Sequence, residues 1–211
     1  MDDTEKKEPS KKDTAIGCLA LIVIATALIF LLKGCFGGDD TKTVTIDWHA
    51  SEIAVENVKA SLAGNYGFKP SSIDIGFPGD ISKVDIIDNA ANPGMKNIQI
   101  YYQPASYWDE TDFVKDAGGT AIYAGSVLFA NPKVEEIVMY AQTEMVDQYG
   151  KTNLDNGVKI VIDRELAAKS NWQGLAQRHT SDPGNIYRIC GNYSIHPGLL
   201  KNVKTEEVKL R

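Results

Sequence analysis

The chain has 211 residues, of which 43% are hydrophobic and 24% are charged, and its net charge is −6. From residue 41 onward it carries 17 Lys and Arg against 21 Asp and Glu. This acidic balance gives no electrostatic basis for binding nucleic acid or anionic lipid headgroups. The same stretch of residues is long enough for one domain with its own hydrophobic core.

The sequence divides into three N-terminal segments and one domain. Residues 1–14 are charged and almost without apolar side chains, which is typical of a disordered cytoplasmic stub. Residues 15–32 form a run of 18 residues without a charge, and as a helix rising ~1.5 Å per residue this run spans the apolar core of a bilayer. Residues 33–42 form a flexible linker before the domain at 43–211. Lys11 and Lys12 stand just before the apolar run and Lys33 follows it, which favours a cytoplasmic N-terminus and an extracytoplasmic domain.

Two alternatives compete with a retained transmembrane signal-anchor. The sequence Leu-Lys-Gly-Cys at 32–35 resembles a bacterial lipobox, in which Cys35 carries the lipid, but Lys33 stands where a small or apolar residue is usual. A cleaved secretory signal needs a shorter apolar core followed by a site of the Ala-x-Ala type, and no such site follows this run. We therefore predict a retained helix, with lipidation at Cys35 as the alternative.

The first half of the domain contains strand and helix patterns. Residues 43–48 alternate apolar and polar side chains and predict a strand, and residues 51–62 have helical spacing and end before Gly64. After an irregular connection rich in Gly, Pro and Ser, residues 83–87 and 97–102 predict two strands separated by turn residues.

A long helix is predicted over residues 109–130. Apolar side chains recur along it at steps of three and four residues, and Ser106 with Asp109 resembles a capping box. The glycines at 118–119 predict a kink or a break in its middle, because glycine weakens a helix interior.

The second half of the domain begins with a β-hairpin. Residues 136–145 and 158–162 predict its strands, with turn chemistry at 149–150 and 156–157, and a second amphipathic helix begins near Arg164. This order predicts an α+β domain in which a mainly antiparallel sheet of β-hairpins carries two to three helices packed on one face.

Candidate catalytic residues are few, because the usual motifs for nucleophilic, metal-dependent or nucleotide chemistry are missing from the sequence. The one possible Cys/His nucleophile set in the domain is Cys190 with His179 and His196, since a thiolate needs a neighbouring base. The apolar neighbours of Cys190 favour a buried, inert thiol without a disulfide partner. We predict no cofactor and no metal, since the three histidines lack helical zinc spacing.

Four aromatic residues within eight positions give the candidate binding site: Tyr101, Tyr102, Tyr107 and Trp108. Rings with an apolar face and a polar tip anchor sugars or protein partners, so Tyr102, Tyr107 and Trp108 are the predicted binding residues. A strand end followed by a hydrophobic staple before the helix is the simpler explanation of the same residues.

Together these features predict a membrane-anchored binding or accessory module on a bacterial cell surface, with an extracellular protein or glycan as its partner. A domain outside the cell without disulfides fits a bacterial surface. The alternative is a cell-envelope hydrolase that uses Cys190, His179 and His196. The two hypotheses differ in whether these three side chains meet at an open cleft or Cys190 lies buried among aliphatic residues.

Overall fold

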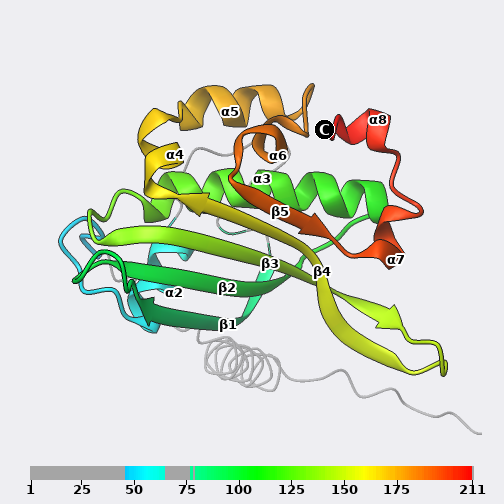
Figure 1. Ribbon diagram of the computed structural model, residues 1–211, viewed down its shortest axis with the longest axis horizontal. Coiled ribbons are helices and arrows are strands. Elements are labelled where there is room, and N and C mark those ends of the chain that lie inside the picture. The colour runs from blue at the N-terminus through cyan, green and yellow to red at the C-terminus, as the bar shows by residue number, and fades with distance from the viewer. Residues whose placement is uncertain (1–45, 65–76, 78, 211) are drawn as a thin grey trace, which may run out of the picture. The chain divides into compact units, whose positions relative to one another are not determined.

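The computed structural model describes residues 46–64, 77 and 79–210 (Figure 1). The predicted stub, the predicted anchor, the linker and Cys35 lie outside the described residues. Within the described part, no helix combines the length and the apolar character needed to cross a bilayer. The chain divides into two units, Met1–Lys42 and Thr43–Arg211, and the features below belong to the second.

One five-stranded sheet forms the base of the domain, in the order β1-β2-β3-β4-β5. Its strands are β1 (Gly79–Asp88), β2 (Lys96–Pro104), β3 (Val134–Val146), β4 (Thr152–Asp163) and β5 (Asn192–Ile195). Neighbouring strands are antiparallel except β2 and β3, which are parallel. The predicted α+β class with a mostly antiparallel sheet is confirmed. The parallel pair arises because a long helix crosses over the sheet between β2 and β3.

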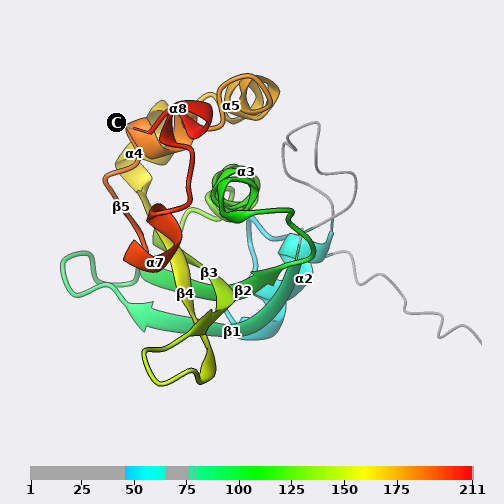
Figure 2. The same ribbon diagram turned by 90° about the vertical axis from the view of Figure 1, so that its right-hand side faces the viewer.

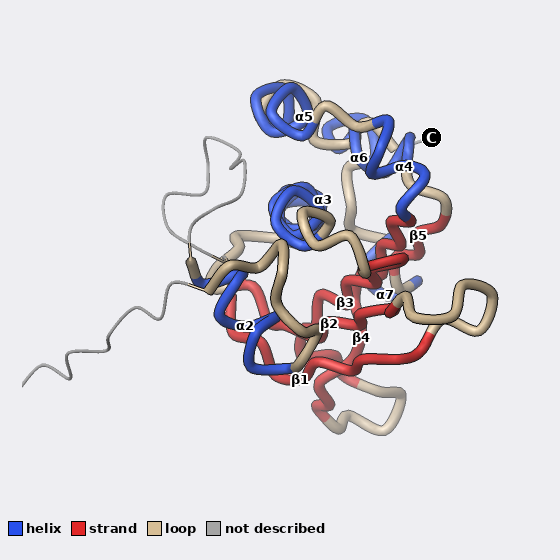
Figure 3. The backbone as a smooth tube through the Cα atoms, turned by 90° about the vertical axis from the view of Figure 1, so that its left-hand side faces the viewer, coloured by secondary structure: helices blue, strands red, loops and turns tan. Residues whose placement is uncertain are grey.

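Helices cover the concave side of this sheet. In the described part they are α2 (Val55–Ala63), α3 (Glu110–Leu128), α4 (Arg164–Lys169), α5 (Trp172–His179), α6 (Asn185–Ile189), α7 (Pro197–Leu200) and α8 (Thr205–Val208). Figures 2 and 3 show the sheet curving around α3, with α5 on the side of α3 away from the sheet. The central helix α3 is therefore enclosed, and most of its residues are buried.

The start of α3 is fixed by Asp109. Its carboxylate accepts a hydrogen bond from the N–H of Asp112 at 2.9 Å, so the N-cap is Asp109 and the predicted cap at Ser106 is wrong. The helix continues without a break through the predicted weak point. A Cβ on Gly118 would lie 3.0 Å from the ring of Tyr187, so glycine at this position allows α6 to approach α3 closely.

The strands place alternate residues in the core. Ile100 of β2 pairs with Met139 of β3, and both are buried beneath α3. The next pair, Tyr101 and Tyr140, lies on the opposite face, where the rings stack with centroids 4.6 Å apart. The strand predictions at 83–87 and 97–102 fall within β1 and β2.

Beyond the rest of the sheet, β3 and β4 continue as a two-stranded arm (Figure 1). The turn at its tip contains residues 149–150, as predicted, and the carboxylate of Asp147 accepts hydrogen bonds from the N–H groups of Tyr149 and Lys151. The second predicted turn, at 156–157, is wrong: these residues lie within β4, where the pairing with β3 shifts register.

The N-terminal part of the predicted sheet is also wrong. Of the strand expected at 43–48, the described residues Ile46 to Trp48 form no strand. Instead, the indole N–H of Trp48 donates to the carbonyl of Leu128 at 3.1 Å, and the amide of Asn131 donates to the carbonyl of Trp48 at 2.8 Å. The alternating apolar residues serve packing against the end of α3, since Trp48 is buried there.

The predicted second amphipathic helix is divided in two. It begins at Arg164 as expected, but α4 ends at Lys169 and α5 starts at Trp172. The side chain of Asn171 caps α5 by accepting from the N–H of Gly174 at 2.9 Å. Ser170 is the C-cap of α4 and Asn171 is the N-cap of α5, so these two polar residues separate the helices.

Candidate functional site

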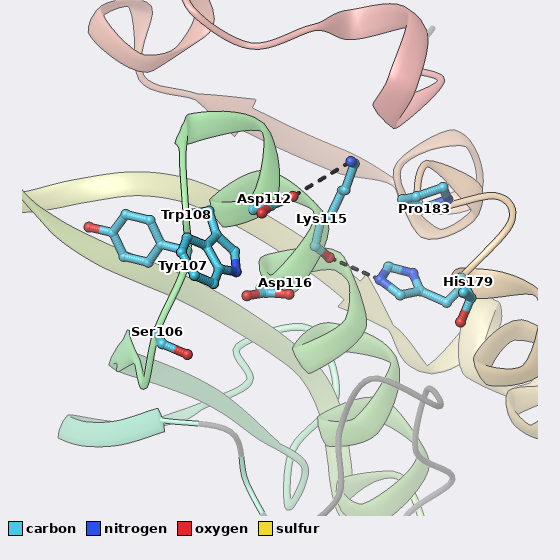
Figure 4. A pocket seen from close by; sticks show the side chains of 9 residues that line it. Ser106, Tyr107, Trp108, Asp112, Lys115, Asp116, His179 and Pro183 are labelled. Carbon is cyan, nitrogen blue, oxygen red and sulfur yellow. Dashed lines mark hydrogen bonds and ion pairs between the residues drawn. The ribbon is translucent and has the colours of Figure 1, made fainter.

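The site that best fits a ligand is a pocket beside the N-terminal half of α3. Its volume is about 320 Å³. The lining comes from the loop before α3, from α3 itself and from the end of α5: Ser106, Tyr107, Trp108, Asp112, Lys115, Asp116, His179, Thr180 and Pro183. Figure 4 shows the two aromatic residues on one side and His179 on the other, with the charged residues of α3 between them.

The three predicted binding residues have different environments. Trp108 is 96% exposed at the edge of the pocket, and Tyr107 is 42% exposed. The hydroxyl of Tyr107 is hydrogen-bonded to that of Thr143 at 2.5 Å, and its ring meets Phe113 edge-on at 4.9 Å. Tyr102 is fully buried, so it has no surface to offer a ligand and its place in the predicted binding set is wrong.

Two carboxylates of α3, Asp112 and Asp116, lie one turn apart in this pocket. The ammonium of Lys115 lies 3.6 Å from Asp112 and 3.2 Å from Glu207. Asp116 has no ion pair within the described residues. Burial, and then the negative charge of Asp112, raise the pKa of Asp116 from 3.8 to about 6.

His179 forms the opposite wall and is 4% exposed. Its Nε2 lies 3.0 Å from the carbonyl oxygen of Lys115, which can only accept, so Nε2 carries the hydrogen. Burial lowers the pKa of His179, so the ring is neutral and Nδ1 is unprotonated.

The residues of the hydrolase hypothesis are held by backbone groups. Cys190 is buried in the hydrophobic core, with its Sγ 3.5 Å from the carbonyl oxygen of Tyr187. His196 caps α7, where its Nδ1 accepts from the N–H of Gly198 at 3.1 Å. His179 donates to α3, as described above. These bonds support structural roles, and the burial of Cys190 is the outcome that counts against the hydrolase hypothesis.

The described residues contain no group of three or more His, Cys, Asp or Glu side chains that could hold a metal ion. Comparison of the chain with protein-family models, with curated proteins and with solved structures gave no match.

The sequence predicts the aromatic residues of the pocket, Tyr107 and Trp108. Its charged residues, Asp112, Lys115 and Asp116, are not among the predicted site residues. Asp112 and Asp116 are separated by four positions in a predicted helix and follow the aromatic pair directly, which is the signal that could have found them. The contribution of His179 depends on α5 packing against α3, a contact between distant segments.

Proposed function

We propose that this chain is a membrane-anchored extracytoplasmic module of a bacterial envelope, which binds a protein or glycan partner at the pocket beside Trp108. The observation that carries the proposal is the 96% exposure of Trp108 at the edge of a pocket. Burying a tryptophan side chain removes about 150–250 Å² from water, which at about 25 cal/mol per Å² is worth about 4–6 kcal/mol. A partner that buries this ring gains that free energy on binding, because folding leaves the ring exposed to water.

The backbone around Trp108 supports a binding role, because the ring is presented from a fixed position. Tyr107 is tied to β3 through Thr143, and Asp109 caps α3. A loop held on both sides loses little conformational entropy when a partner binds.

A binding role is favoured over catalysis by the polar groups of the pocket. The pKa of Asp116, about 6, is suited to proton transfer. However, among the described residues no hydrogen bond joins Ser106, the hydroxyl next to the aromatic pair, to Asp116 or to His179, so the nucleophile–base pair of a hydrolase is not assembled here.

The membrane anchor in this proposal rests on the sequence. The uncharged run at 15–32 is followed by a Gly-rich linker and a domain that forms a separate compact unit. This arrangement supports a tethered domain outside the cell, with lipidation at Cys35 as the alternative attachment.

Site-specific photo-crosslinking in cells that express the full chain tests the proposal. A photoreactive phenylalanine analogue at position 108 should give a discrete, reproducible adduct. The matched control is the same analogue at position 149, since Tyr149 is 79% exposed on the arm. In parallel, Trp108→Ala should change the free energy of unfolding by no more than about 0.5 kcal/mol, because the side chain is exposed. Equal labelling at both positions, or a clear loss of stability in Trp108→Ala, would contradict the proposal.

A further inference from the structure

We infer that the pocket beside Trp108 takes an organic cation, a primary ammonium or guanidinium group carried by a partner's Lys or Arg side chain or by a free amine. This inference rests on the proposed function and names the chemistry of the ligand. It follows from the charges of the pocket, from the environment of Asp116 and from the exposed indole.

The fixed charges of the pocket leave a negative excess. Asp112 and Asp116 contribute two carboxylates, and Lys115 contributes one ammonium. That ammonium lies between Asp112 and Glu207, at 3.6 Å and 3.2 Å, so it is already engaged. His179 adds no positive charge, because burial lowers its pKa.

Asp116 is the carboxylate of the pocket whose negative charge is not compensated by an ion pair within the described residues. The titratable groups that line the pocket with it or interact with it electrostatically come from four elements: Asp112 and Lys115 on α3, His179 on α5, Tyr102 on β2 and Tyr187 on α6. Both phenols are uncharged, since burial raises the pKa of each. Lys115 is thus the single cation among these groups, and its ion pairs are with other carboxylates. An incoming ammonium would compensate the charge of Asp116 and favour its ionised form.

Trp108 supplies the second element of cation recognition. The face of an indole attracts ammonium and guanidinium groups through its quadrupole, and this attraction is strongest for tryptophan among the aromatic side chains. At 96% exposure its ring is free to cover a group that enters the pocket. The volume of about 320 Å³ suits the end of one side chain or a small amine. An anion would instead meet two carboxylates.

Isothermal titration of the full-length protein in detergent micelles tests this inference with matched probes. The cationic probes are n-butylammonium, n-butylguanidinium and the peptide acetyl-Gly-Lys-Gly-amide, and the neutral match is the same peptide with its lysine Nε-acetylated. We expect the cations to bind and the neutral peptide to bind at least about 10-fold more weakly. Similar affinities for the peptide and n-butylammonium would indicate that the site reads the ammonium group alone, whereas much tighter peptide binding would indicate a protein chain as its source.

Three variants separate the contributions. Asp116→Asn should weaken the cations about 10-fold or more, and Trp108→Ala about 5- to 30-fold. Asp80→Asn, which removes an exposed carboxylate of β1, should leave the affinity unchanged. With a pKa of about 6 for Asp116, affinity should fall about 10-fold from pH 7 to pH 5, and Asp116→Asn should lose this dependence.

Three results would overturn the inference: equal affinity for the charged and neutral peptides, unchanged affinity in Asp116→Asn, or tighter binding of a neutral chitooligosaccharide than of any cation. In each case a specific adduct at position 108 would keep the proposed binding function intact, so failure of the ligand class and failure of the function are distinguishable.

Discussion

Replacing Asp116 by Asn should stabilise the protein at neutral pH. Asp116 titrates near pH 6 in the folded state and near 3.8 when unperturbed. The folded state therefore holds its proton more tightly, and stability falls as the pH rises from about 4 to above 6. The difference between the two pKa values corresponds to about 3 kcal/mol, which solvent screening of a part-exposed carboxylate reduces to about 1–2 kcal/mol. Asparagine has the same shape and no charge, so Asp116→Asn should regain this amount at pH 7 and almost none below pH 4.

Near-ultraviolet circular dichroism of the full chain in micelles measures this effect, because it follows aromatic packing in the domain. For a domain of this size, 1 kcal/mol corresponds to about 2–4 °C, so the midpoint of thermal unfolding should rise by about 2–8 °C at pH 7 and converge with the wild type near pH 4. Asp80→Asn is the control for removal of an exposed carboxylate. A variant without the gain at pH 7, or with a gain that is equal at pH 4 and pH 7, would refute the assignment of a destabilised carboxylate to this pocket.

Three other predictions test the fold and the anchor. Asn131→Ala should lower the free energy of unfolding by about 2–4 kcal/mol in denaturant titration, because it leaves the carbonyl of Trp48 and its neighbours without a buried donor; a loss below about 0.5 kcal/mol would contradict this. Gly184→Ala would bring a Cβ to 2.3 Å from the carbonyl oxygen of Val208, so α8 should detach from the domain. The variant should then be cut faster at α8 in limited proteolysis, and an unchanged cleavage rate would contradict this prediction. Protease added to intact cells should remove the domain but leave a membrane fragment containing residues 15–32, and full protection of the domain would exclude the predicted orientation.

The parts of the fold that the sequence predicted are those that depend on local periodicity. The strands at 83–87 and 97–102, the hairpin turn at 149–150 and the long helix α3 each have their pattern within one segment. The parallel pairing of β2 with β3 follows from how α3 crosses the sheet, which no single segment encodes. Trp48 shows the limit most clearly. Its segment has the alternation of a strand, but tertiary contacts with α3 decide its conformation. The indole of Trp48 is buried against the end of α3 and does not contribute to the sheet.

In the candidate site, as in the fold, the features encoded within one segment were predictable and those that depend on tertiary contacts were not. The pairing of Tyr107 with Trp108 before a helix cap is visible in the sequence, and its two explanations, packing and binding, predict opposite exposures for the rings. In the structure Tyr107 is hydrogen-bonded to Thr143 and packs on Phe113, while the ring of Trp108 is exposed. The pKa of the Asp116 carboxyl is raised first by burial, which depends on the fold, and then by the charge of Asp112 on the same helix, which is the part visible in the sequence. An exposed indole is common enough on its own, and so is a half-buried aspartate. Their presence in one pocket, with the nearest ammonium already paired to other carboxylates, is the combination from which we propose a cation-binding site.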